Sequence, residues 1–143
     1  MTYFGQRAPY GALLKGPRPE KLKPVNKPGK QPRELAPAHL AAIRKCPCMA
    51  CRTDASNMEA AHIRMSDRSR GKPLTGLAMK PDDKWTLPLC HKHHMEQHNG
   101  NEELFWINLG IDPLALAELL WSVSPKVEAM REICFHPPAN TRG

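Results

Sequence analysis

One cysteine and four histidines lie within nine residues in the second half of the chain, and their spacing indicates metal binding. They are Cys90, His91, His93, His94 and His98. Cys90 and His93 have the C-x-x-H spacing of one half of a structural zinc site, and Cys48 and Cys51 supply a C-x-x-C half. Structural zinc takes four such ligands in a tetrahedron. The two halves together therefore predict one closed Zn²⁺ site.

His94 and His98 are four residues apart, which on a helix places them one turn above the other on the same face. At about 100° per residue, this pair points roughly a quarter-turn away from Cys90 and His93. One helix start is therefore predicted to serve a closed zinc site and also an open site for a catalytic divalent metal. An open site keeps positions for water and phosphate. The alternatives are that His94 replaces His93 as a zinc ligand and that His98 is a surface residue.

The remaining cysteines are interpreted as thiols. Cys46 competes with Cys48 for the zinc, but a C-x-x-C pair gives better geometry than C-x-C, so Cys46 is expected to be free. Cys134 is expected to be a core thiol on the last helix. The chain has five cysteines, an odd number, and no apolar stretch follows its N-terminal methionine as in a secretory signal. Metal ligands and free thiols are therefore favoured over disulfides.

Hydrophobic periodicity and breaker residues predict a single α+β domain that positions these ligands. A basic, proline-rich arm is predicted over 1–35, a core over 36–100 and packed helices over 101–143. In the core we expect a helix over 38–45, a strand over 58–64, a long loop over 65–83, a strand over 85–89 and a helix over 91–97. In the C-terminal part we expect helices over 101–107, from 113 onward and over 125–134. The arm contains six prolines between positions 9 and 32, which exclude a helix there.

The charge of the chain favours a polyanionic partner. The 143 residues carry a formal net charge of +7 with a pI near 9.4, as is common for nucleic-acid-binding proteins. The arm is interpreted either as a solvated tail or as a segment that follows DNA phosphates and makes binding salt-dependent. Aromatic residues near its tip, Tyr3, Phe4 and Tyr10, suggest a third option, attachment of the tip to the domain surface or to a partner chain. No apolar run is long enough to predict a membrane span.

The order of three short segments, CMAC, AAHIR and LPLCHKHHMEQH, resembles the HNH nucleases of the ββα-metal fold, and most closely the small phage and prophage members. The resemblance covers about residues 46–100. It implies a zinc-braced ββα-metal core in which His62 activates water, while His94 and His98 bind Mg²⁺ or another divalent metal. The implied function is an endonuclease that hydrolyses DNA phosphodiester bonds in phage recombination, repair or genome processing. The implied location is the cytoplasm of a bacterial host, with a homodimer or a phage protein as further partners.

Two positions depart from the family pattern and leave the ligands of the catalytic metal open. Many members carry an aspartate or histidine ligand immediately before the strand histidine, where this chain has Ala61. The middle asparagine of the motif would fall near Trp85 and is missing. Asp82 or Asp83 could replace one of these ligands, and Asp83 is our choice. Glu59 is a weaker candidate, because the alternation of a strand puts it on the opposite face from His62.

Arg64 shares the strand face of His62 and is expected to hold the phosphate at the cut, although a surface salt bridge is the alternative. A structural histidine is the alternative for His62. Little base specificity is expected, because no recognition helix stands out. Ala61 and the missing asparagine favour a rival function, a catalytically inactive zinc module that binds nucleic acid or protein. A third option is a structural component of a phage assembly whose arm threads into a neighbour.

Overall fold

A computed structural model describes residues 32–55, 57–74 and 80–143. These residues form five α-helices, two short 3-10 helices and one two-stranded antiparallel sheet, which confirms the predicted α+β class. The predicted arm falls largely on residues 1–31, and part of the predicted loop falls on residues 75–79. Both segments lie outside the described residues. The observed element boundaries differ from the predicted ones by at most two residues.

The sheet pairs β1 (Glu59–His62) with β2 (Thr86–Leu89) in an antiparallel register that sets His62 opposite Thr86 and Glu59 opposite Leu89. All four residues of β2 are buried. Pro88 can occupy this strand because a two-stranded sheet leaves one edge of each strand unpaired. The carbonyl of Pro88 accepts a hydrogen bond from the Met49 amide at 3.0 Å, which ties β2 to the turn that carries Cys48 and Cys51.

Two helices flank the sheet close to the predicted ligands. Helix α1 (Pro37–Ile43) begins with proline at its first turn, where the missing N–H costs no hydrogen bond. Helix α2 (His91–Asn99) follows β2 directly, and Cys90 is its N-cap residue. Both helices contact both strands. The sheet therefore lies next to α1 and next to α2, the helix that carries the predicted histidine ligands.

Side-chain caps begin two of the three C-terminal helices. Asn101 accepts the Leu104 amide at 3.1 Å and begins α3 (Glu102–Leu109), and Asp112 accepts the Ala115 amide at 3.2 Å and begins α4 (Pro113–Val123). Gly110, with φ 66°, ends α3 in a left-handed conformation. The last helix is α5 (Val127–Phe135).

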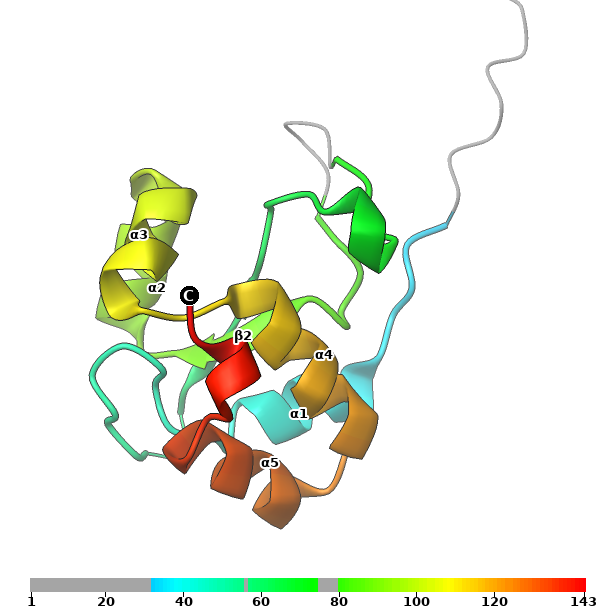
Figure 1. The fold of residues 1–143 in the computed structure, drawn as a ribbon. Helices are drawn as coiled ribbons and strands as arrows, with labels where there is room; N and C mark the ends of the chain where they lie inside the picture. The colour runs from blue at the N-terminus through cyan, green and yellow to red at the C-terminus, as the bar shows by residue number, and fades with distance from the viewer. Residues whose placement is uncertain (1–31, 56, 75–79) are drawn as a thin grey trace, which may run out of the picture. The chain divides into compact units, whose positions relative to one another are not determined.

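The core forms where α1, α4 and α5 meet the buried strand β2. Figure 1 shows α4 beside β2 and α5, with α1 next to α5, whereas α2 and α3 pair with each other at the opposite end of the fold. The fully buried side chains of this core include Ile43, Leu87, Leu116, Leu120 and Met130. Within the described ranges, no helix has both the length and the apolar character that a bilayer span requires.

The predicted loop over 65–83 contains structure of its own. Asp67 and Lys72 exchange backbone hydrogen bonds of 3.0 Å across the 3-10 helix η1 (Arg68–Arg70). Arg70 donates to Glu118 of α4 at 2.9 Å. This side-chain contact fastens the described part of the loop to the C-terminal helices, which the polar composition of the segment did not predict. A second 3-10 helix, η2 (Ala139–Thr141), ends the chain.

Candidate functional site

The four predicted zinc ligands come together at the start of α2. One ligand atom from each of Cys48, Cys51, Cys90 and His93 lies within 4.8 Å of every other, so the cluster could hold a metal ion such as zinc. The Sγ atom of Cys48 lies 3.8 Å from Nδ1 of His93, and the Sγ atoms of Cys51 and Cys90 lie 3.9 Å apart. Within the three described ranges, no other group of three or more histidine, cysteine or acidic side chains is this close.

These distances fit a tetrahedral zinc ion. Two sulfur atoms bound to zinc at about 2.3 Å lie about 3.8 Å apart, and a sulfur and a nitrogen ligand lie about 3.6 Å apart. The Cys90–His93 distance is shorter, at 3.0 Å, so these two atoms must separate slightly to admit the ion. The Nε2 atom of His93 faces the Glu96 carboxylate at 3.9 Å, which favours the tautomer with Nδ1 free to bind metal.

The backbone explains why Cys48 and Cys51 belong to this cluster. The Cys48 amide donates to the Thr53 carbonyl at 2.9 Å, and the Arg52 amide donates to the Cys48 carbonyl at 2.9 Å, which closes a tight turn. Arg52 has φ 63°, a left-handed conformation that is uncommon for a residue with a Cβ atom. Cys46 is fully buried, and its Sγ lies 3.5 Å from the Ala42 carbonyl, away from the cluster. The choice between the two cysteines thus falls on Cys48.

The surroundings of the thiols differ. The Thr53 hydroxyl, 3.0 Å from Cys51, and the Thr53 amide lower the pKa of the Cys51 thiol to about 6. Burial raises the pKa of the Cys90 thiol. The lowered pKa favours the thiolate form of Cys51, which is the form that zinc requires.

The three predicted catalytic histidines line one pocket of about 520 Å³. His62 comes from β1, and His94 and His98 come from successive turns of α2. The full lining consists of Arg33, Leu40, Arg44, Ala60, His62, Arg64, Lys80, Pro81, His94 and His98. Four of these side chains are cations and none is acidic, so the pocket suits an anionic ligand.

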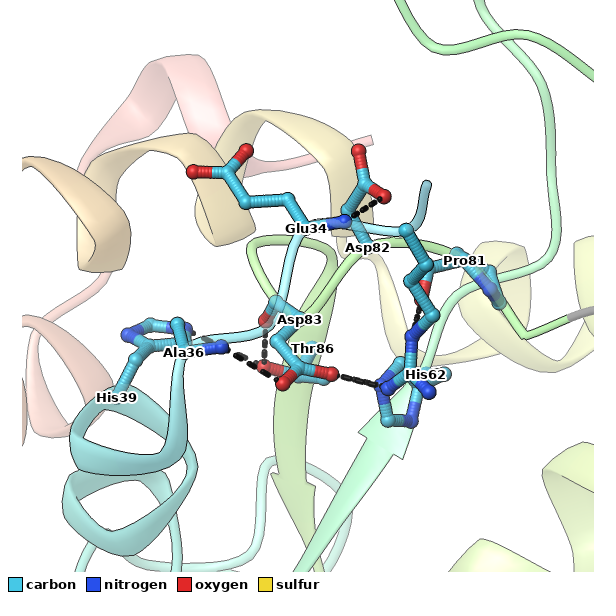
Figure 2. Close-up of polar contacts among 9 residues, drawn as sticks. Glu34, Ala36, His39, His62, Pro81, Asp82, Asp83 and Thr86 are labelled. Carbon is cyan, nitrogen blue, oxygen red and sulfur yellow. Dashed lines mark hydrogen bonds and ion pairs between the residues drawn. The ribbon is translucent and has the colours of Figure 1, made fainter. Parts of the chain in front are cut away.

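A buried carboxylate holds His62. The Oδ1 atom of Asp83 accepts from Nε2 of His62 at 2.9 Å, and Oδ2 accepts the Ala36 amide at 2.9 Å, as Figure 2 shows. Arg33 also donates to Asp83 Oδ1 and to the Pro81 carbonyl, the latter at 2.8 Å. Asp83 is only 2% exposed. A carboxylate can only accept, so the 2.9 Å bond to Asp83 requires the His62 proton on Nε2 and leaves the Nδ1 lone pair free. The Arg33 guanidinium lies 3.1 Å from the same Nε2 and can only donate, so it opposes this tautomer, while the shorter contact with the charged carboxylate favours it.

The charges around this pair favour a neutral imidazole beside an ionised carboxylate. Burial is the main cause that lowers the pKa of His62, and the positive charge of Arg33 adds to it, whereas the hydrogen bond that His62 donates to Asp83 raises it. Burial raises the pKa of Asp83, but the Ala36 amide, His62 and Arg33 outweigh it and hold that pKa below the ordinary value. His62 can therefore accept a proton at neutral pH.

Glu59 orients His94. Its carboxylate accepts from Nδ1 of His94 at 2.7 Å and from Nδ1 of His91 at 3.0 Å. The register explains this contact, since Glu59 pairs with Leu89, the residue before the Cys90 cap of α2. A carboxylate on one ring nitrogen is the usual support of a metal-binding histidine, and it leaves Nε2 of His94 free to bind.

Arg64 and His98, two further residues of the pocket, contact each other, and α3 binds the backbone of Arg64. Nε2 of His98 accepts from the Arg64 guanidinium, so this nitrogen presents a lone pair. Glu102, the first residue of α3, accepts the Arg64 amide at 3.1 Å and the side chain of the buried Gln97 at 3.0 Å. Gln97 also donates to the His62 carbonyl at 3.1 Å. Through these bonds, α3 fixes the end of β1 against α2.

The structure thus brings His62, Arg64, His94 and His98 together, whereas Asp83 differs from expectation. Asp83 does not line the pocket, and both of its oxygens are engaged by His62, Arg33 and Ala36. Its geometry is that of a support for His62 and not of a metal ligand. Sequence reasoning missed the pocket role of Arg33, which it assigned to the arm, and the contacts of Glu59 and Glu102. Of these, only Glu59 had a sequence signal, namely its place opposite the end of β2 in a hairpin.

The arrangement combines a Cys/His cluster that could hold a metal ion with a basic pocket lined by His62, which Asp83 supports, and by two further imidazoles. Comparisons of the chain with protein-family models, with curated proteins and with solved structures found no match. The geometry of the two sites is therefore the basis for assigning a function.

Proposed function

We propose that the protein is a metal-dependent endonuclease of the HNH type that hydrolyses DNA phosphodiester bonds. In this proposal β1, β2 and α2 form a zinc-braced ββα-metal core. The observation that carries it is the shared pocket: His62, His94 and His98 line one cavity together with four cations. The resemblance of the CMAC, AAHIR and LPLCHKHHMEQH segments adds a role in phage recombination, repair or genome processing.

His62 acts as the general base. Asp83 fixes the tautomer with the proton on Nε2, so Nδ1 accepts the proton of an attacking water. The neutral form that this step needs prevails at pH 7 because burial lowers the pKa of His62. A supported neutral histidine of this kind contributes about 10²–10⁴-fold to a rate.

His94 and His98 hold a divalent ion such as Mg²⁺, Mn²⁺ or a softer metal in this proposal. When bound, the ion supplies Lewis-acid stabilisation of the scissile phosphate and of the leaving oxygen. Glu59 keeps Nε2 of His94 available, as its bond to Nδ1 fixes the ring. With a metal on Nε2 of His98, the Arg64 guanidinium that now donates to that nitrogen would be free to hold the phosphate, the role expected from its strand face.

Asp83→Asn is expected to lower the nicking rate by about 10²-fold or more. If the new amide NH₂ faces His62, it donates to Nε2 and moves the ring proton to Nδ1, where the lone pair is needed. If the amide oxygen faces His62 instead, the NH₂ group opposes the Ala36 amide and that bond is lost. The measurement is the initial rate of plasmid nicking. A rate within a factor of three of the wild type would show that Asp83 does not support the base.

The direct test of the function is nicking of supercoiled plasmid by zinc-loaded protein, with and without added Mg²⁺, Mn²⁺ or Ni²⁺. We expect nicked product only when one of these ions is present, because the zinc site has no open position. Absence of product with every ion, from protein with its full zinc content, would contradict the proposal.

One observation favours a second candidate, a catalytically inactive zinc module that binds nucleic acid. Among the described residues, no third histidine, cysteine or acidic side chain joins His94 and His98 in a compact group, and Ala61 cannot serve. This candidate predicts DNA binding with no nicking. The plasmid assay, run beside a binding assay, separates the two functions.

A further inference from the structure

We propose that Arg44 and Lys80 form a phosphate-binding rim that carries the DNA backbone from the histidine pocket onto α1. This inference rests on the proposed function, because it assumes that the pocket receives a DNA phosphate. Both side chains line the pocket. Arg44 follows α1, and α1 lies outside the segment that resembles HNH nucleases. The rim thus extends the binding surface beyond the core that contains the histidines.

Two of the four pocket cations, Arg33 and Arg64, have side-chain partners, whereas the two rim residues have none among the residues that the structure describes. Arg33 is paired with Asp83, and Arg64 donates to His98. The side chains of Arg44 and Lys80 make no hydrogen bond or ion pair with any residue in the described part of the chain. None of the ten lining residues is acidic. Two unbalanced cations gathered at one cavity favour a polyanion that binds across both of them.

Helix geometry places the charge of Arg44 toward the pocket. Leu40 and Arg44 are four residues apart, so they share one face of this helical turn, and both line the cavity. Lys45 is the next residue and points about 100° away from Arg44. It does not line the pocket, and its carbonyl accepts from Arg131 at 2.6 Å. Lys45 carries the same charge as Arg44 but lies outside the pocket, so Lys45→Ala is a matched control for Arg44→Ala.

A second matched comparison exists for Lys80. Lys84 is close in sequence and equally charged, but its Nζ lies 4.6 Å from the centroid of the Trp85 ring and outside the pocket lining. Non-specific attraction of DNA to a basic protein should respond similarly to loss of either lysine. A defined phosphate path through the pocket should respond mainly to loss of Lys80.

The experiment measures binding of a short labelled DNA duplex as a function of salt, without added divalent metal, so that no cutting occurs. The plot of log Kobs against log salt has a negative slope. Arg44→Ala and Lys80→Ala are each expected to reduce the magnitude of this slope by about 0.9, the value for one lost phosphate contact. Lys45→Ala and Lys84→Ala should change it by less than half as much. Equal changes in all four variants, or no change in the first two, would overturn the rim.

Cleavage kinetics distinguish a binding role from a catalytic one. Arg44→Ala should raise the plasmid concentration for half-maximal nicking rate several-fold, by a larger factor than any fall in the rate at saturating plasmid. A lower saturated rate with unchanged half-saturation would contradict a purely phosphate-binding rim. If the four variants show the expected changes in salt slope but the wild type never nicks, the endonuclease is contradicted and the rim is supported, so the two proposals fail separately.

Discussion

Cys48→Ser should lose the zinc ion and leave the protein unfolded at room temperature. Zinc binding contributes about 10–16 kcal/mol to the folding of small zinc-finger peptides, and a typical domain has only about 5–15 kcal/mol of net stability. Here the four ligands join the turn after α1 to the start of α2. A serine hydroxyl stays protonated at neutral pH and cannot replace the thiolate. Zinc content by metal analysis and helix content by circular dichroism are the measurements.

Cys46→Ala is the matched control for this result. Cys46 is buried two residues away, and its thiol contacts the Ala42 carbonyl outside the cluster. We expect this variant to keep one zinc per chain and to lose about 1–3 kcal/mol of stability from the lost contacts. If Cys46→Ala lost the zinc and Cys48→Ser retained it, the assignment of the ligands would be reversed.

His62→Ala should reduce the initial rate of plasmid nicking by about 10²–10⁴-fold, because the attacking water loses its proton acceptor. Zinc content and DNA affinity should stay at wild-type values, since His62 lies outside the zinc cluster and is not a cation at neutral pH. His136→Ala is the control, as this exposed histidine does not line the pocket. Equal nicking by wild type and His62→Ala would remove His62 from the mechanism.

The pH profile of the wild type provides an independent check on His62. The base must be neutral to act, so the rate falls as pH drops through its pKa. Burial lowers that pKa below the ordinary value of 6.5. The acid limb of the profile should therefore have its midpoint below pH 6.5. A midpoint above 7 would mean that a different group, or a differently charged pocket, controls the rate.

Local spacing was sufficient to predict the ligand cluster and the histidine pair. C-x-x-C, C-x-x-H and the four-residue interval from His94 to His98 depend on turn and helix geometry alone, which neighbouring residues determine. The same holds for the α+β class and for the helix starts at Asn101 and Asp112, where side-chain caps occur as expected.

The parts of the site that the sequence did not predict depend on contacts between distant segments. Arg33 meets Asp83 from 50 positions away, and Glu102 reaches the Arg64 amide across 38 positions. No periodicity encodes such pairs. Strand alternation puts Glu59 on the other face from His62, which made it a weak candidate for a metal ligand. Its position at the end of the strand nevertheless brings its carboxylate to His94 of α2. Asp83 had the right chemistry for a metal, yet burial beside His62 gives it a supporting role.

The most direct test of the endonuclease compares wild type and His94→Ala for two quantities in the same samples, zinc content and Mg²⁺- or Mn²⁺-dependent plasmid nicking. Because His94 faces the pocket while His93 faces the thiols, both proteins should contain one zinc per chain and only the wild type should nick DNA. Nicking by His94→Ala at the wild-type rate would contradict the proposed catalytic metal site. Loss of zinc from that variant would contradict the separation of the two sites.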